Sequence, residues 1–121
     1  MNIKRFLAIA ICMGMGYGII GCMSAEVPIQ AENVSVILAP GHTLPAAIAS
    51  ATARRGWLPQ KQEDGTIRCT FQKRDSLVVV DVVLNNEQSF SVRLVQSNVS
   101  VRKYNQWVNN LVHDIIFFAS H

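Results

Sequence analysis

Residues 66–96 read TIRCTFQKRDSLVVVDVVLNNEQSFSVRLVQ. Apolar and polar side chains alternate over 66–73, 76–84 and 88–96, and short polar turns separate the three segments. A period of two is typical of strands with one covered face, and short turns join antiparallel neighbours. The stretch therefore predicts three consecutive strands of an antiparallel meander.

The flanking sequence adds one strand and two helices to this meander. Residues 57–62 predict a first strand, which ends at a polar turn over 63–65. Apolar residues recur at helical spacing over 43–55 and again over 101–119. The expected fold class is α+β, a two-layer α-β-β-β-β-α sandwich with a four-stranded antiparallel meander and both helices packed on one face.

The first predicted helix has a boundary signal at each end. Thr43 is a good N-terminal cap, because its hydroxyl can accept a hydrogen bond from the first turn. Gly56 can close the helix in the left-handed conformation. Arg54 and Arg55 lie in the last turn of this helix, where their positive charges interact favourably with the negative end of the helix dipole.

The start of the chain has the features of a secretory signal. Lys4 and Arg5 precede an uncharged apolar run over 6–20, which is shorter than the roughly 20 residues of a membrane-spanning helix. The run ends in Ile19-Ile20-Gly21-Cys22. These four residues resemble the lipobox of bacterial lipoproteins. The resemblance implies cleavage between Gly21 and Cys22 and attachment of lipid, palmitate included, to Cys22.

The chain is accordingly expected to have three parts. Residues 1–21 are a lipoprotein signal peptide, 22–42 are the lipidated cysteine and a tether, and 43–121 are a small α+β domain. Within the tether, residues 34–38 could form a short strand or lie on the domain. Met23 follows the cysteine, and the absence of Asp there favours the outer membrane, facing the periplasm, in a Gram-negative cell.

Two motifs flank the meander: Arg55-Gly56-Trp57 after the first helix, and the segment 104–108, YNQWV, in the last helix. With the alternating strands between them, they resemble a family of small, functionally uncharacterised Gram-negative lipoproteins. The likeness covers most of residues 43–118. It implies the same α+β fold and an envelope location, and it brings no site residues.

The charge of the chain does not favour a nucleic-acid partner. The full sequence has 11 Lys and Arg, 8 Asp and Glu and a formal net charge of +3. Lys4 and Arg5 belong to the predicted signal peptide, which leaves nine basic against eight acidic residues. A net charge of about +1 is typical of a solvated, nearly neutral domain, so we expect no nucleic-acid binding.

No residue pattern predicts metal binding, a cofactor or catalysis. His42, His113 and His121 have no partner at ligand spacing, and no cysteine pair is present after Cys22. Cys69 falls on the apolar face of its predicted strand, which favours an inert, buried thiol. We therefore expect the protein not to be an enzyme.

One candidate binding feature comes from the aromatic residues. Trp57, Tyr104 and Trp107 could line a groove between helix and sheet, although the same spacing fits a core stripe. The basic pairs at 54–55 and 102–103 could form a patch for acidic lipid or glycan, or they could be separate solvated charges.

These features together predict an outer-membrane-anchored periplasmic lipoprotein with a non-enzymatic structural or protein-interaction role. Its expected partners are the membrane, through the lipid on Cys22, and an envelope protein. The alternative is a binding module for a small ligand or peptide in the envelope.

Overall fold

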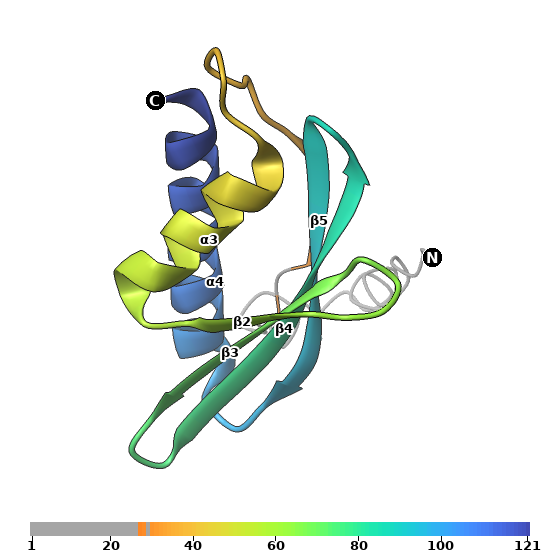
Figure 1. The fold of residues 1–121 in the computed structure, drawn as a ribbon. Helices are drawn as coiled ribbons and strands as arrows, with labels where there is room; N and C mark the ends of the chain where they lie inside the picture. The colour runs from red at the N-terminus through yellow and green to blue at the C-terminus, as the bar shows by residue number, and fades with distance from the viewer. Residues whose placement is uncertain (1–26, 29) are drawn as a thin grey trace, which may run out of the picture.

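The computed structural model describes residues 27–28 and 30–121, which form one antiparallel sheet covered by two helices (Figure 1). The sheet has the strand order β1-β5-β4-β3-β2. In chain order the elements are β1 (Ala31–Ser35), α3 (Leu44–Arg55), β2 (Leu58–Lys61), β3 (Ile67–Lys73), β4 (Ser76–Asn86), β5 (Ser89–Ser97) and α4 (Val101–Ser120).

The predicted α+β class is confirmed, and the meander runs from β2 to β5 through consecutive antiparallel neighbours. Beyond the predicted four-stranded meander, β1 pairs with the free edge of β5 and adds a fifth strand to the sheet. Residues 31–38 therefore belong at least partly to the domain rather than to a tether. The backbone N–H of Val36 donates to Gln88 O at 2.9 Å, and the Val36 side chain is only 6% exposed.

An irregular backbone explains why β1 has no period-two pattern. The pairing register shifts between Ala31 and Val34, and Asn33 between them has a positive φ of 48°. Its displaced N–H donates to Ser91 Oγ at 3.0 Å, which replaces a regular ladder bond. Because such an irregularity changes which face each side chain meets, alternation is lost along the strand.

The boundaries predicted for the first helix are confirmed in α3. The hydroxyl of Thr43 accepts a hydrogen bond from Ala46 N at 3.3 Å. Gly56 follows the helix with φ 85°, and its N–H donates to Thr52 O. A side chain at this left-handed position would be strained, so the glycine ends α3 and turns the chain toward β2.

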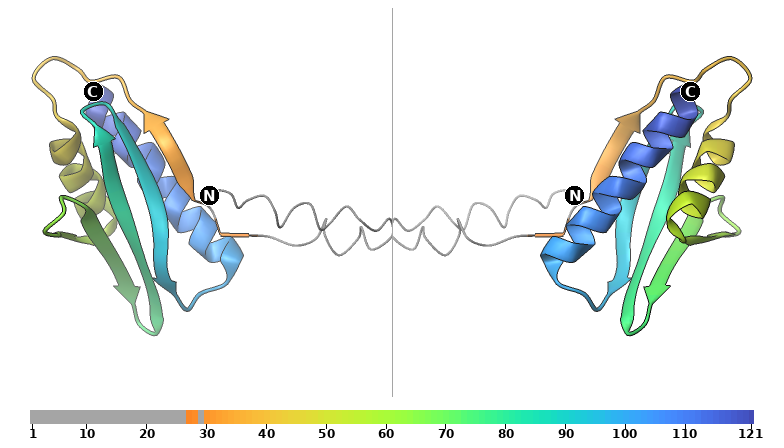
Figure 2. Two further views of the ribbon diagram at one scale, coloured as in Figure 1. Left: turned by 90° about the vertical axis from the view of Figure 1, so that its right-hand side faces the viewer. Right: turned by 90° about the vertical axis from the view of Figure 1, so that its left-hand side faces the viewer.

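The long helix α4 begins at a second hydroxyl cap, where Ser100 Oγ accepts from Lys103 N at 3.1 Å. Helices α3 and α4 lie on the same face of the sheet (Figures 1 and 2). Neither helix of the described range is long and apolar enough to cross a membrane. The fully buried side chains between helices and sheet include Ile48, Cys69, Val80, Val82, Phe90, Tyr104, Val108, Leu111 and Ile115.

The two ends of the molecule are built from different loops, as Figure 2 shows. At one end the segment 36–43 lies against the last turn of α4, where Ala39 N donates to Ala119 O at 2.9 Å. At the other end the β3–β4 turn is bonded to the loop before α4: Asn98 Nδ2 donates to Asp75 O at 2.8 Å. Leu77 N donates to Asn98 Oδ1, also at 2.8 Å.

Candidate functional site

Three aromatic rings from separate parts of the chain meet in one cluster. Trp57 follows the Gly56 turn, Phe71 comes from β3 and Trp107 from α4. The Phe71 ring centre lies 5.4 Å from that of Trp57 and 4.7 Å from that of Trp107, the latter in an edge-to-face arrangement. Such geometries are favourable for aromatic pairs, so Phe71 holds the two indoles at fixed positions.

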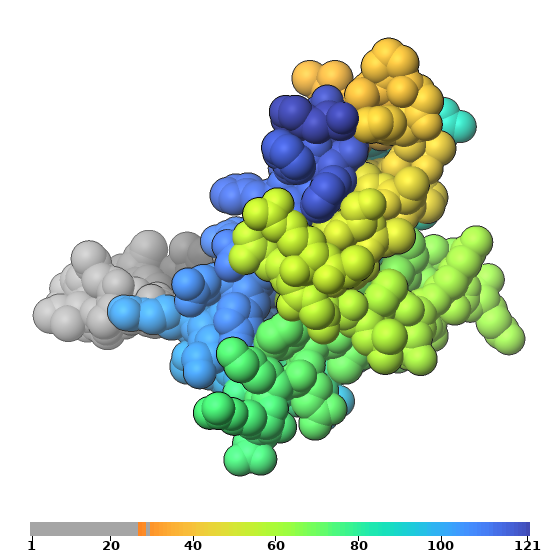
Figure 3. Space-filling view, turned by 60° about the vertical axis from the view of Figure 1, so that its left-hand side comes forward, coloured from red at the N-terminus to blue at the C-terminus, as the bar shows by residue number. Residues whose placement is uncertain are grey.

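These rings line a shallow hollow of about 260 Å³, which we call the aromatic groove. The face that carries α3 and α4 is seen in Figure 3. The groove is open on one side and combines apolar ring surface with three polar side chains. Its lining consists of Arg54, Arg55, Trp57, Phe71, Trp107 and Asn110.

The two arginines of the groove differ in whether they form an ion pair. Arg55 Nε donates to Asp114 Oδ2 at 2.6 Å, and the Asp114 side chain is only 8% exposed. This ion pair ties the end of α3 to α4. Arg54 is exposed and makes no ion pair with any residue that the structure describes. A solvated guanidinium beside aromatic rings can receive an anionic group.

A further cation lies over one of the groove's rings, that of Trp107. The Lys103 ammonium is 5.8 Å from the centre of the Trp107 ring, within the range of a cation–π contact. Lys103 and Trp107 are four residues apart on α4, so they share one helix face. The positive charge near the groove thus comes from both helices.

The groove predicted from Trp57, Tyr104 and Trp107 is only partly the groove that the structure contains. Trp57 and Trp107 do come together in it. Tyr104 does not, because it is 1% exposed and faces the core, where burial raises the pKa of its hydroxyl to about 12. The predicted set does not include Phe71, whose ring lies against both indoles.

Cys69 is a core residue, as its strand position predicts. It is fully buried, and burial raises the pKa of its thiol to about 12, with the Asp81 carboxylate adding to the shift. The thiolate is the nucleophilic form of cysteine, and almost none is present at neutral pH. Cys69 is therefore unsuited to nucleophilic chemistry.

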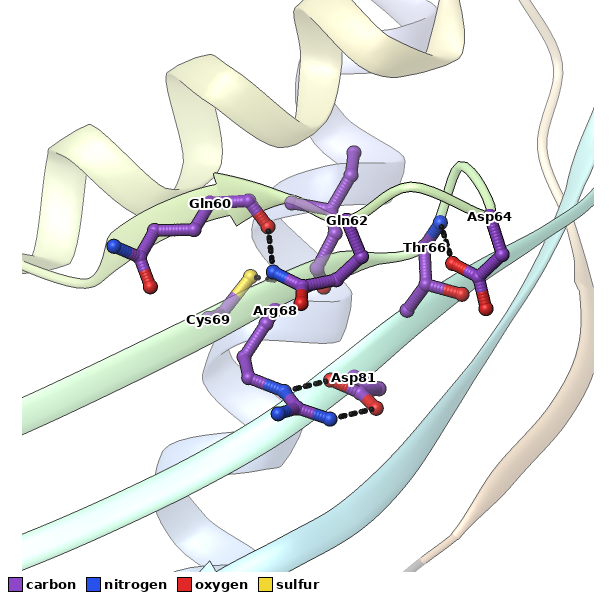
Figure 4. A network of polar contacts seen from close by, with 8 residues as sticks. Gln60, Gln62, Asp64, Thr66, Arg68, Cys69 and Asp81 are labelled. Atoms are coloured by element: carbon purple, nitrogen blue, oxygen red, sulfur yellow. Dashed lines mark hydrogen bonds and ion pairs between the residues drawn. The ribbon is translucent and has the colours of Figure 1, made fainter.

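Polar residues on the uncovered face of the sheet have structural partners (Figure 4). The Arg68 guanidinium binds both carboxylate oxygens of Asp81, at 2.8 and 3.0 Å, across β3 and β4. In the β2–β3 turn, Thr66 N donates to Asp64 Oδ1 at 2.9 Å, and this bond lowers the pKa of Asp64. These contacts organise the sheet and its turns.

Residues 27–28 and 30–121 have two further features that bear on a site. A second hollow of about 260 Å³ lies between α3 and the β2–β3 hairpin, with a mostly apolar lining that includes Ile48, Pro59 and Ile67. No group of three or more His, Cys, Asp or Glu side chains in this range could hold a metal ion. The predicted lipidation and cleavage residues, Gly21 and Cys22, lie outside the described residues.

Neither a protein-family model nor a curated protein sequence matches this chain.

Proposed function

We propose that the protein is a lipid-anchored envelope protein, held in the outer membrane and facing the periplasm, with a non-enzymatic, contact-based role. The observation that carries this proposal is Ile19-Ile20-Gly21-Cys22 at the end of an uncharged apolar run that follows Lys4 and Arg5. This order is that of a secretory signal, and its last four residues resemble the lipobox of bacterial lipoproteins. The likeness to small Gram-negative lipoproteins is part of the same proposal.

Several acyl chains on one residue would keep the domain on a membrane permanently. A single chain gives marginal binding, at about 0.8 kcal/mol per buried methylene, and stable anchoring requires a second. Eight residues, 23–30, separate Cys22 from β1. They span at most about 29 Å. The anchored domain would therefore work close to the bilayer, within reach of other envelope proteins.

Substitution of Cys22 tests the anchor. In cells fed an alkyne analogue of palmitate, the natural chain should be labelled and processed, whereas Cys22→Ser should be unlabelled and keep residues 1–21. Cys12→Ala, in the apolar run, is the matched control and should behave like the natural chain. Labelling and processing of Cys22→Ser would contradict the proposal.

Membrane separation tests the location. The natural chain, with Met23 after the cysteine, should fractionate with the outer membrane, and Met23→Asp should shift it to the inner membrane. If the natural chain fractionates with the inner membrane, the anchor can stand while the outer-membrane assignment fails. Crosslinking of the lipidated protein in intact cells would then identify the envelope protein that it contacts.

The aromatic groove favours a second candidate function, the binding of a small anionic ligand or peptide. Ring faces of Trp107 and Phe71 would hold an apolar or planar part, and Arg54 would pair with a carboxylate. The sequence has two tryptophans, and both line this groove. The whole tryptophan fluorescence of the protein therefore reports on the proposed site.

Fluorescence titration tests the groove directly. Short peptides with an aromatic residue and a free terminal carboxylate should quench or shift the emission, and Arg54→Gln should weaken this binding. Lys61→Gln, which removes an exposed cation from β2, is the control and should not alter the titration. Unchanged emission with such peptides, or equal effects of the two variants, would count against the groove.

A further inference from the structure

The described part of the chain nearest to Cys22 lies against the beginning of α4. The carbonyl of Val27 accepts a hydrogen bond from Asn105 Nδ2 at 3.0 Å. Five peptide units separate Val27 from Cys22, and they span at most about 18 Å. The last residue of α4, Ser120, is fifteen residues beyond Asn105. That is about 22 Å along a helix. A lipid on Cys22 would thus be held near the first half of α4.

Basic side chains gather at the same end of the molecule. The hydrogen bonds of Asn98 join the β3–β4 turn to the loop that precedes α4. The turn and the first residues of α4 both lie on the lower half of the surface in Figure 3. The exposed side chains that we call the basic end are Lys73, Arg74 and Lys103.

The charge of this end differs from that of the opposite end. Asp75 is the one acidic residue in the described turn and loop segments 73–77 and 97–103. The opposite end consists of 36–43, 86–89 and 117–121, and these described segments contain Glu87 and no Lys or Arg. The molecule therefore has a positive end where the chain comes from Cys22, and a weakly negative end on the far side.

We propose that the basic end faces the bilayer and binds the anionic phospholipid headgroups around the Cys22 lipid. The inference rests on the proposed lipidation, which brings the domain to the membrane. Attraction between exposed charges fades over about 8 Å at physiological salt, so it orients only a domain that is already close. Basic residues next to a membrane anchor are attracted to anionic lipid in this way.

The consequence is a defined orientation of the domain on the membrane. The start of α4 and the β3–β4 turn lie at the headgroups, and the β4–β5 turn with Glu87 points away. Because Lys103 lies over Trp107, the aromatic groove is on the bilayer side of the domain.

Two matched cysteine variants test this orientation. The first variant, Gln72→Cys, places a thiol next to Lys73, and the second, Gln88→Cys, places one at the far end. Both glutamines are exposed, whereas the native Cys69 is buried. The full lipidated protein is labelled with a bimane fluorophore and reconstituted into phosphatidylcholine vesicles that carry a headgroup nitroxide, with or without phosphatidylglycerol. We expect at least about twofold stronger quenching at 72 than at 88 with phosphatidylglycerol, lost at high salt.

Charge reversal completes the test. Lys73→Glu with Arg74→Glu should remove the difference between the two positions. Lys61→Glu with Arg93→Glu makes the same change in net charge elsewhere on the sheet and should preserve it. Equal quenching at 72 and 88, indifference to phosphatidylglycerol, or equal loss in both double variants would overturn the inference.

The mass of the purified protein separates this inference from the proposed function. A protein without lipid on Cys22 overturns both. A lipidated protein that shows no charge-dependent orientation overturns the basic end alone and leaves the anchor standing.

Discussion

Burial in the core raises the pKa of two side chains, the thiol of Cys69 and the phenol of Tyr104. Burial raises the thiol pKa from 9.0 to about 12 and the phenol pKa from 10.0 to about 12. Above pH 9 the unfolded thiol releases a proton that the folded state retains. The contribution of the thiol to stability is therefore complete below pH 9, and that of the phenol below pH 10. Each contribution falls as the pH rises from there toward 12, by about 1.4 kcal/mol per pH unit.

We expect Cys69→Ala to have a shallower alkaline loss of stability than the natural chain. The variant loses core packing at neutral pH but also loses one of the two titrating groups. Urea unfolding at several pH values from about 8 to 11 should show the difference in unfolding free energy shrinking as the pH rises. A constant difference across this range would mean that the thiol is not protected in the folded state.

The ion pairs on the two sides of the sheet should differ in strength. Asp114→Asn should reduce the free energy of unfolding by about 1–2 kcal/mol, because it weakens a charge-assisted bond to Arg55 at a nearly buried site. Asp81→Asn should have an effect below about 1 kcal/mol, since the Arg68 pair is more exposed. Equal losses of unfolding free energy in the two variants, measured by urea unfolding, would show that burial does not make the Arg55–Asp114 pair stronger than the Arg68–Asp81 pair.

At the scale of elements, β1 and the residues directly after it give the sharpest test. They fall within the predicted tether 22–42, in which residues 34–38 could form a short strand or lie on the domain. Val36 is 6% exposed, whereas its neighbour Ile37 is 80% exposed. Val36→Ala should therefore destabilise the protein by about 1–2 kcal/mol, and Ile37→Ala by less than about 0.5 kcal/mol.

Hydrogen exchange provides an independent measurement of the segment that follows β1. The Val36 amide, bonded to Gln88 O, should exchange far more slowly than an amide in a solvated segment. Rapid exchange at Val36 together with equal effects of the two alanine substitutions would mean that this segment is not part of the folded domain in solution.

At the scale of the whole molecule, helices and sheet share one hydrophobic core. The buried cluster contains residues from α3, α4, β3, β4 and β5, and Val36 joins it from the segment after β1. Small domains with one such core usually unfold in a single cooperative transition. We expect urea curves from far-UV circular dichroism, which follows the helices, and from tryptophan fluorescence, which follows the groove, to coincide. Distinct midpoints would show that the groove opens before the core.

The sequence by itself determined the elements whose signals are local. Alternation over 66–96 predicted β3, β4 and β5 nearly to their ends, because a covered sheet face repeats every second residue. Thr43 and Gly56 marked the ends of α3, because capping depends on the few residues at the helix terminus.

The tertiary structure alone decided the features that depend on distant residues. β1 is held by the edge of β5 and has a shifted register, so no pattern within residues 31–35 identifies it as a strand. The groove is formed by Phe71 between two tryptophans from other elements, while Tyr104 turns into the core. The sequence period shows which side chains share one face of a helix or strand, but it does not distinguish among them. Packing against other elements decides which of these side chains is buried and which lines a surface groove.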